Sequence, residues 1–225
     1  MINKIMGVLF QLTPRFFQPS VMSKWNDLSR NNQTIQKMII KDWENSGRPC
    51  PPPHIIKQLA IFKFQEISNY SSFVETGTFL GDMIEAQMNN FNQLYSIELS
   101  EPLYLKAKKR FEGLPKVEIL NGDSGTVLVS LAKELTMPSI FWLDGHYSGG
   151  FTAKGDKDCP IIEELDAIFN GGQLKHIILI DDARLFVGKN AYPTIDELKH
   201  YISSQSLQYQ LNIENDIIAL TPNAE

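Results

Sequence analysis

Asp144 and His146 stand two residues apart in the stretch FWLDGHYSGG (141–150), where an apolar run gives way to small and polar residues. The apolar half is typical of a buried strand, whereas the second half is too polar for a core and has too little charge for an ordinary solvated loop. A carboxylate can bind a cation, and a histidine can accept a proton near neutral pH. The stretch is therefore a candidate functional site, although His146 could equally serve only to hydrogen-bond a loop carbonyl.

Acidic residues stand at or just after the ends of apolar runs that are typical of strands. The runs cover residues 71–76, 93–99, 116–120, 139–144 and 176–181. The acids are Glu75, Glu98, Asp123, Asp144, Asp181 and Asp182. If the strands are parallel, these carboxylates converge on one edge of the sheet, where open α/β sheets bind ligands. Because like charges repel, such an edge suits a metal ion, a cationic cofactor or ribose hydroxyls. Any one of these acids, taken alone, could instead cap a helix or face solvent in a turn.

Helical patterns separate these runs and lead to a fold prediction. Helices are expected at residues 80–90, 101–112, 124–135, 160–170 and 193–204, and two closing strands at 207–213 and 216–221. Strands that alternate with helices build a parallel sheet covered on both faces. The sequence therefore predicts an α/β domain with a seven-stranded, mostly parallel sheet and helices on both faces.

Residues 1–54 differ from the rest and are predicted to form an N-terminal helical extension that ends in a Pro-rich loop. Its apolar residues Ile35, Met38, Ile39 and Trp43 follow a helical pattern and must bury against another surface. We expect the extension to lie over or beside the ligand-binding edge of the main domain, residues 55–225, as a lid or as a contact in a homodimer. A simple cap on an apolar face of that domain is the alternative.

Composition and charge exclude several classes of protein. The 225 residues are 43% hydrophobic and carry a formal net charge of −5, which allows a sizeable core but gives no basic surface for nucleic acid. Cys50 and Cys159 form no C-x-x-C pair, so we expect no disulfide framework or zinc site and a reducing, cytoplasmic location. The N-terminal run MINKIMGVLF is short and lacks a signal-peptide cleavage pattern, so we expect neither a signal peptide nor a membrane span.

The turn ETGTFLG (75–81) bears on the class of cofactor. It spaces Gly77 and Gly81 as G-x-x-x-G, which differs from the G-x-G-x-x-G of dinucleotide-binding proteins. This turn, with an acid ending the next strand, resembles the class I S-adenosylmethionine-dependent methyltransferases, which have a Rossmann-like fold. The resemblance implies that the turn holds the methionine end of the cofactor, Glu98 the ribose, and the Asp123–Ser124 pair the adenine. The residues assigned to S-adenosylmethionine are Glu75, Thr76, Gly77, Thr78, Gly81, Glu98, Asp123, Ser124 and Asp144.

The later acids resemble those of metal-dependent O-methyltransferases of the catechol and macrolide-sugar types, and the resemblance covers residues 70–220. Those enzymes carry an aspartate after the fourth strand and an Asp-Asp or Asp-Asn pair after the fifth. The resemblance implies Mg²⁺ or Mn²⁺ at Asp144, Asp181 and Asp182, whose oxygen atoms suit a hard ion. It also implies that His146 is a general base beside the acceptor hydroxyl, which makes Asp144 and His146 the expected catalytic residues.

The leading functional prediction is a divalent-metal-dependent O-methylation of a small hydroxylated acceptor, such as a sugar, by S-adenosylmethionine. Two alternatives stay open. In the first, the cofactor is the same but no metal takes part, so that Asp181 and Asp182 are structural. In the second, the domain binds a nucleotide without catalysis or uses a cofactor of the NAD type, against which the missing G-x-G-x-x-G counts. The acceptor is not readable from the sequence, because this fold serves many substrates.

Overall fold

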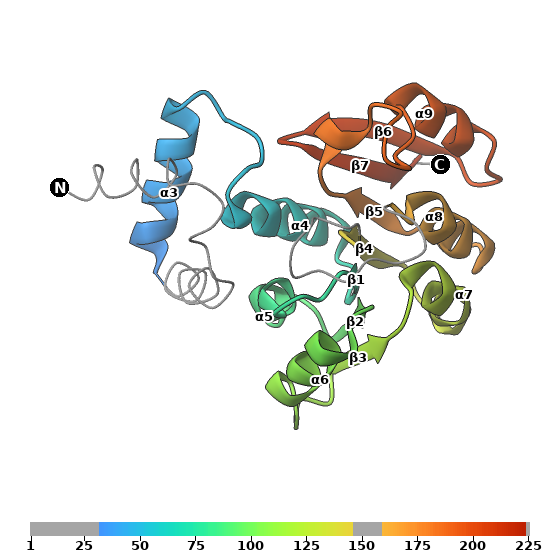
Figure 1. Cartoon of the computed structure of the whole chain (residues 1–225), viewed down its shortest axis with the longest axis horizontal. Coiled ribbons are helices and arrows are strands. Elements are labelled where there is room, and N and C mark those ends of the chain that lie inside the picture. The colour runs from blue at the N-terminus through green and yellow to red at the C-terminus, as the bar shows by residue number, and fades with distance from the viewer. Residues whose placement is uncertain (1–31, 146–158, 224–225) are drawn as a thin grey trace.

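A twisted seven-stranded sheet forms the centre of the molecule in the computed structural model, which describes residues 32–145 and 159–223 (Figure 1). Its strand order is β3-β2-β1-β4-β5-β7-β6. Strands β1 to β5 run parallel to one another, whereas β7 is antiparallel to both β5 and β6. The strands are β1 (Ser72–Thr76), β2 (Gln93–Glu98), β3 (Val117–Asn121), β4 (Ser139–Leu143), β5 (Ile177–Ile180), β6 (Tyr209–Glu214) and β7 (Ile217–Pro222). The predicted mostly parallel α/β sheet is confirmed.

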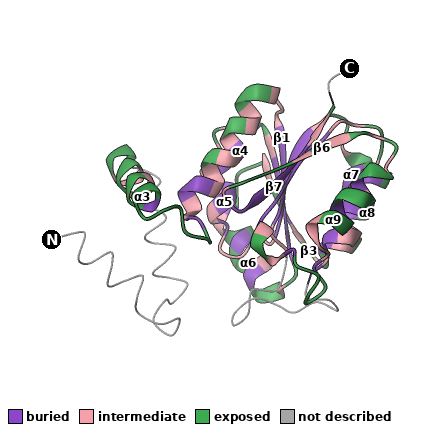
Figure 2. Ribbon diagram, turned by 90° about the horizontal axis from the view of Figure 1, so that it is seen from above, coloured by how far each residue is buried: buried purple, intermediate pink, exposed green. Residues whose placement is uncertain are grey.

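Helices cover both faces of this sheet, as Figure 2 shows. On one face lie α4 (His54–Ser68), α5 (Asp82–Gln87) and α6 (Glu101–Arg110). On the other lie α7 (Ser124–Glu134), α8 (Ile161–Asn170) and α9 (Ile195–Ser203). A short 3-10 helix, η1 (Ala183–Leu185), follows β5, and α3 (Gln33–Asn45) stands beside the domain. Within the described part of the chain, no helix combines the length and the apolar character that a membrane span needs.

The central strands β1 and β4 are buried along their whole length. Successive side chains of a strand point to opposite faces, so both faces must be apolar where helices cover both. Phe73 accordingly packs in the core on the α4–α5–α6 side, while its neighbour Val74 packs in the core on the α7–α8–α9 side. This explains why the strands read as continuous apolar runs in the sequence.

Strand register brings the carboxyl ends of the parallel strands to one level. Thr76 pairs with Ile97 on β2 and with Leu143 on β4, and Leu143 pairs with Ile180 on β5. The residues that come next are Gly77, Glu98, Asp144 and Asp181. The predicted convergence of strand-end acids on one edge therefore follows from the register.

Helix α4 was not predicted from the sequence, which assigned no element to residues 55–70. Its sequence, HIIKQLAIFKFQEIS, has β-branched and aromatic residues on several sides and only a weak helical period. Packing decides its structure, because Ile61 is completely buried against the sheet. The predicted helix around Trp43 is present as α3, and Trp43 packs against Ile55 and Ile56 at the start of α4.

Candidate active site

The turn from β1 into α5 is packed directly against the end of β4. Gly77 has φ +84°, and a Cβ atom built on it would lie 2.4 Å from the backbone oxygen of Asp144. The Asp144 N–H donates to the Thr76 carbonyl and hydroxyl oxygens, each at 3.2 Å. A glycine is required at position 77 both by its φ and by this contact. The β1–α5 turn thus fixes the backbone of Asp144 beside Thr76 and Gly77.

The second glycine of the turn has a different neighbour from the one expected of a ligand-binding glycine. A Cβ atom on Gly81 would lie 2.6 Å from Cε2 of the Phe111 ring, which follows α6. Gly81 also has φ +82° and precedes the first residue of α5. The absence of a side chain at Gly81 therefore leaves room for the Phe111 ring, so this glycine has a packing role.

Glu75 lies beneath the turn in a chain of hydrogen bonds. Its Oε2 accepts from the Ser96 hydroxyl at 2.6 Å, and Ser96 Oγ lies 2.6 Å from Thr78 Oγ1. Glu75 and Thr78 are both buried. Burial raises the pKa of Glu75 well above its usual value, and the negative charge of Asp144 adds to this effect. A carboxyl group in this position needs either a proton or a nearby cation.

Glu98, at the end of β2, is held by two backbone N–H groups. Phe79 N donates to its Oε2 at 2.8 Å, and Ser100 N donates to its Oε1 at 2.9 Å. Burial raises the pKa of Glu98, and these backbone N–H groups oppose the rise by stabilising the ionised form. Glu98 is thereby fixed between the β1–α5 turn and the start of α6, with lone pairs left to accept hydroxyl hydrogens.

Asp123 and Ser124, predicted to lie beside the adenine, have structural partners as well. Asp123 caps α7 by accepting from Thr126 N at 3.1 Å, as the helix-cap alternative expected. Ser124 is buried and donates to Glu164 Oε1 at 2.6 Å. Glu164 is a buried acid on α8 that sequence analysis missed. Nothing in the sequence singled it out, because α8 also carries Glu163 and Asp166, and only the structure shows that Glu164 lies on the buried face.

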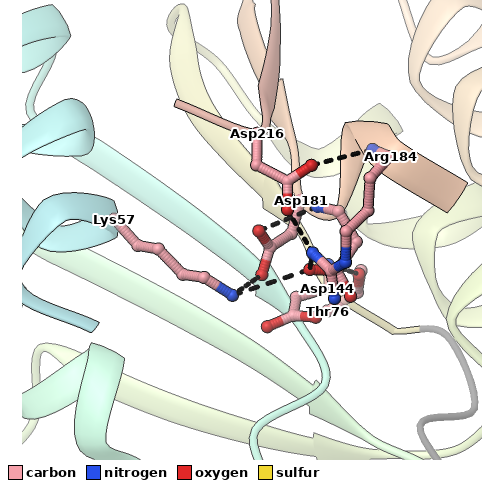
Figure 3. Close-up of polar contacts among 7 residues, drawn as sticks. Lys57, Thr76, Asp144, Asp181, Arg184 and Asp216 are labelled. Atoms are coloured by element: carbon pink, nitrogen blue, oxygen red, sulfur yellow. Dashed lines mark hydrogen bonds and ion pairs between the residues drawn. The ribbon is translucent and has the colours of Figure 1, made fainter. Parts of the chain in front are cut away.

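Two cations lie among the predicted metal ligands, and Figure 3 shows them reaching in from opposite sides. Lys57 of α4 forms a short ion pair with Asp181, and its Nζ lies 3.9 Å from Asp182 Oδ1. On the other side, Arg184 donates to Asp182 Oδ1 at 2.6 Å and pairs with Asp216 of the β6–β7 turn. Both cations were absent from the sequence prediction.

The charged groups of this cluster lie close together, and each affects the pKa of its neighbours. Burial raises the pKa of Asp181, and the ammonium group of Lys57 opposes that rise. Burial lowers the pKa of Lys57, but Asp181, Asp144 and Asp182 together outweigh it and raise the value. Within residues 32–145 and 159–223, no three or more His, Cys, Asp or Glu side chains are arranged as a ready metal site.

His146 and the polar loop that follows it lie outside the described residues, which stop at Gly145 and resume at Cys159. The predicted catalytic role of His146 therefore stays a prediction. The remaining predicted residues Glu75, Thr76, Gly77, Thr78, Glu98, Asp144, Asp181 and Asp182 lie at one edge of the sheet. Their side chains give this edge many acceptor oxygens, with Lys57 and Arg184 paired to Asp181 and Asp182.

No protein-family model and no curated protein matches this sequence. Solved structures do match it. An O-methyltransferase from Bacillus cereus, in complex with SAH, is 13% identical with a TM-score of 0.56, and the match covers 90% of this chain and 97% of that one. The O-methyltransferase TomG from Streptomyces achromogenes, in complex with SAM, is 14% identical with a TM-score of 0.57 and coverages of 91% and 96%. This chain has the class I methyltransferase fold.

A third structure supports the same assignment. A SAH-bound methyltransferase from Podospora anserina is 13% identical with a TM-score of 0.56, and the match covers 95% of this chain and 99% of that one. The matches span nearly the whole length of both chains, so the likeness extends over the whole fold. At these identities the likeness establishes the fold, and the activity must be argued from the site.

Proposed function

We propose that the protein is an S-adenosylmethionine-dependent O-methyltransferase that acts on a small hydroxylated acceptor such as a sugar. The observation that carries the proposal is the arrangement of Glu75, the Gly77 turn and Glu98 at the strand ends of this fold. S-adenosylmethionine presents an ammonium group, a sulfonium and a ribose diol, all of which are matched by acceptor oxygens or negative charge. The side chains at this edge therefore fit the cationic and hydroxyl groups of this cofactor.

The turn residues would bind and orient the cofactor. Glu98 would accept hydrogen bonds from the ribose hydroxyls with the lone pairs that its backbone partners leave unused. Glu75 and the turn at Gly77 would lie at the methionine end, where a cationic group favours the ionised form of the buried carboxyl. When bound, S-adenosylmethionine supplies a methyl group on a positively charged sulfur, which is electrophilic without further activation.

The acceptor side would be formed by the ends of β4 and β5. The acceptor oxygen forms a bond to the methyl carbon as the carbon–sulfur bond breaks, and the bonding pair returns to sulfur. The hydroxyl proton must then go to a base, and we assign this role to His146, two residues after Asp144. A neutral imidazole suits that task near neutral pH.

The predicted Mg²⁺ or Mn²⁺ site does not fit the residues as they lie. Three carboxylates offer the hard oxygen ligands that such an ion prefers. However, Asp181 is paired with Lys57 and Asp182 with Arg184, so two of the three already have a cationic partner. A divalent ion would have to break the buried Lys57–Asp181 pair and the partly exposed Arg184–Asp182 pair to bind. The proposed reaction therefore includes no metal ion, which is the first of the two alternatives open from the sequence.

A thermal-shift panel with S-adenosylmethionine, S-adenosylhomocysteine and NAD, each with and without Mg²⁺, tests the proposed class of enzyme. A ligand that binds only the folded protein raises the melting temperature of the protein, and the rise grows with the logarithm of the ligand concentration. We expect the first two ligands to raise the melting temperature, NAD to leave it unchanged, and Mg²⁺ to add nothing. Stabilisation by NAD alone would reject a methyltransferase.

A further inference from the structure

Helix α4 places Lys57 beside the carboxyl ends of the parallel strands. Lys57 stands in its first turns, and its side chain is only 15% exposed. Its ammonium group pairs with Asp181 and lies 3.9 Å from Asp182 Oδ1. The negative charge of Asp144 also raises the pKa of Lys57. The ammonium group of Lys57 therefore interacts with the same three carboxylates that the sequence assigns to a divalent ion.

The position of Lys57 is held by packing on both sides along the chain. Just before it, Ile55 and Ile56 pack with Trp43 of α3, and the Trp43 indole N–H donates to the Pro49 carbonyl at 2.9 Å. Further along α4, Ile61 is completely buried in the core. Ile61 thus anchors α4 on the sheet, while the α3 contacts pack against its start, and Lys57 between them pairs with Asp181.

We propose that the Lys57 ammonium is the resident cation of the Asp144–Asp181–Asp182 cluster and stands where a divalent metal ion would bind. The inference deepens the proposed function, because this cluster lies on the acceptor side of the proposed reaction. An ammonium group brings one positive charge and three N–H donors. Lys57 thereby offsets one of the three negative charges of the cluster. Lysine and metal are alternatives, because both need the same oxygens of Asp181.

The test measures binding of Mn²⁺ alone, from the loss of the free-ion signal in electron paramagnetic resonance, so no acceptor is needed. Lys57→Met removes the charge and keeps the length of the side chain. We expect this variant to bind one Mn²⁺ at least about tenfold more tightly than the unmodified protein. Adding Asp181→Asn to Lys57→Met should abolish the gain, because it removes a charged ligand.

Lys63→Met is the matched control, since Lys63 lies on the same helix and pairs with Glu214 at 3.3 Å in an exposed position. It should leave Mn²⁺ binding unchanged. The proposal is overturned if Lys57→Met binds Mn²⁺ no more tightly than Lys63→Met. It is also overturned if the unmodified protein binds Mn²⁺ tightly and loses it on Asp181→Asn. This second measurement remains decisive should Lys57→Met fail to fold.

S-adenosylhomocysteine affinity, measured on the same samples, separates this inference from the proposed function. If every variant binds Mn²⁺ as expected but none binds S-adenosylhomocysteine, the assignment of Lys57 stands and the methyltransferase activity falls. If all bind S-adenosylhomocysteine but the Mn²⁺ gain is missing, the role of Lys57 falls and the methyltransferase stands.

Discussion

At the scale of single residues, the buried carboxyl group of Glu75 leads to a testable prediction about stability. Its burial raises its pKa well above the usual value, so the folded protein keeps a proton that the unfolded chain releases above about pH 4.3. The free energy of unfolding must then fall as pH rises from that point toward the folded-state pKa. Glu75→Gln removes the titration and keeps an oxygen to accept from Ser96. We expect the variant to become more stable relative to the unmodified protein as pH rises.

Urea unfolding at several pH values between about 4 and 8 measures this difference. Glu66→Gln, an exposed acid on α4, supplies the control and should show no such trend. A Glu75→Gln variant whose stability follows that of the unmodified protein at every pH would mean that the buried carboxyl is not protonated.

The acids of the site could be predicted from the sequence, whereas their cationic partners could not. Glu98, Asp144 and Asp181 stand at the ends of apolar runs, and parallel strands must bring such ends together. Lys57 lies 124 residues before Asp181 on a helix that the sequence did not reveal, so nothing local connected the two. Arg184 is only two residues from Asp182, but a short separation does not show which way a side chain turns.

At the scale of elements, the β1–α5 turn depends on the missing side chain of Gly77. Gly77→Ala must hold an alanine at φ +84° and place its Cβ against the Asp144 carbonyl oxygen. Gly113 has a similar φ of +80°, but a Cβ atom built on it would meet nothing within 4 Å, so Gly113→Ala isolates the cost of the backbone conformation. That cost is about 1–2 kcal/mol. We expect Gly77→Ala to cost about 1–3 kcal/mol more, as overpacking does.

Urea denaturation of the two variants gives both costs in one experiment, and S-adenosylhomocysteine binding should be weakened only in Gly77→Ala. Equal losses of stability would show that the turn yields easily and that its contact with Asp144 does not constrain the site.

The strands were easier to predict than the helix that completes the site. β1 and β4 are buried on both faces, and their apolar runs have few other structural solutions. Helix α4 has nearly as apolar a sequence, with Ile and Phe residues that also favour strands, so only its packing on the sheet identifies it as a helix. The expected boundary between residues 54 and 55 falls within its first turn.

At the scale of the whole molecule, the sheet order places the proposed acceptor and cofactor sides next to each other. β1 lies between β2 and β4, so the carboxylate of Glu98 and the Asp144–Asp181–Asp182 cluster flank the Gly77 turn. Alternating strands and helices predicted a parallel sheet but could not fix this order, which depends on pairing between distant segments. Helix α3 contacts the start of α4 through Trp43. A lid or dimer role for residues 1–54 stays a prediction.

Calorimetric titration of S-adenosylhomocysteine into the protein and its Glu98→Ala variant tests the central claim most directly. Glu98→Ala removes an ionised acceptor of two ribose hydroxyls, so affinity should weaken by about 1.5–3 kcal/mol. Glu118→Ala, an exposed acid on the neighbouring strand β3, should bind as the unmodified protein does. A folded Glu98→Ala variant with unchanged affinity, or an unmodified protein that does not bind S-adenosylhomocysteine at all, would contradict the assignment of this edge as a methyltransferase active site.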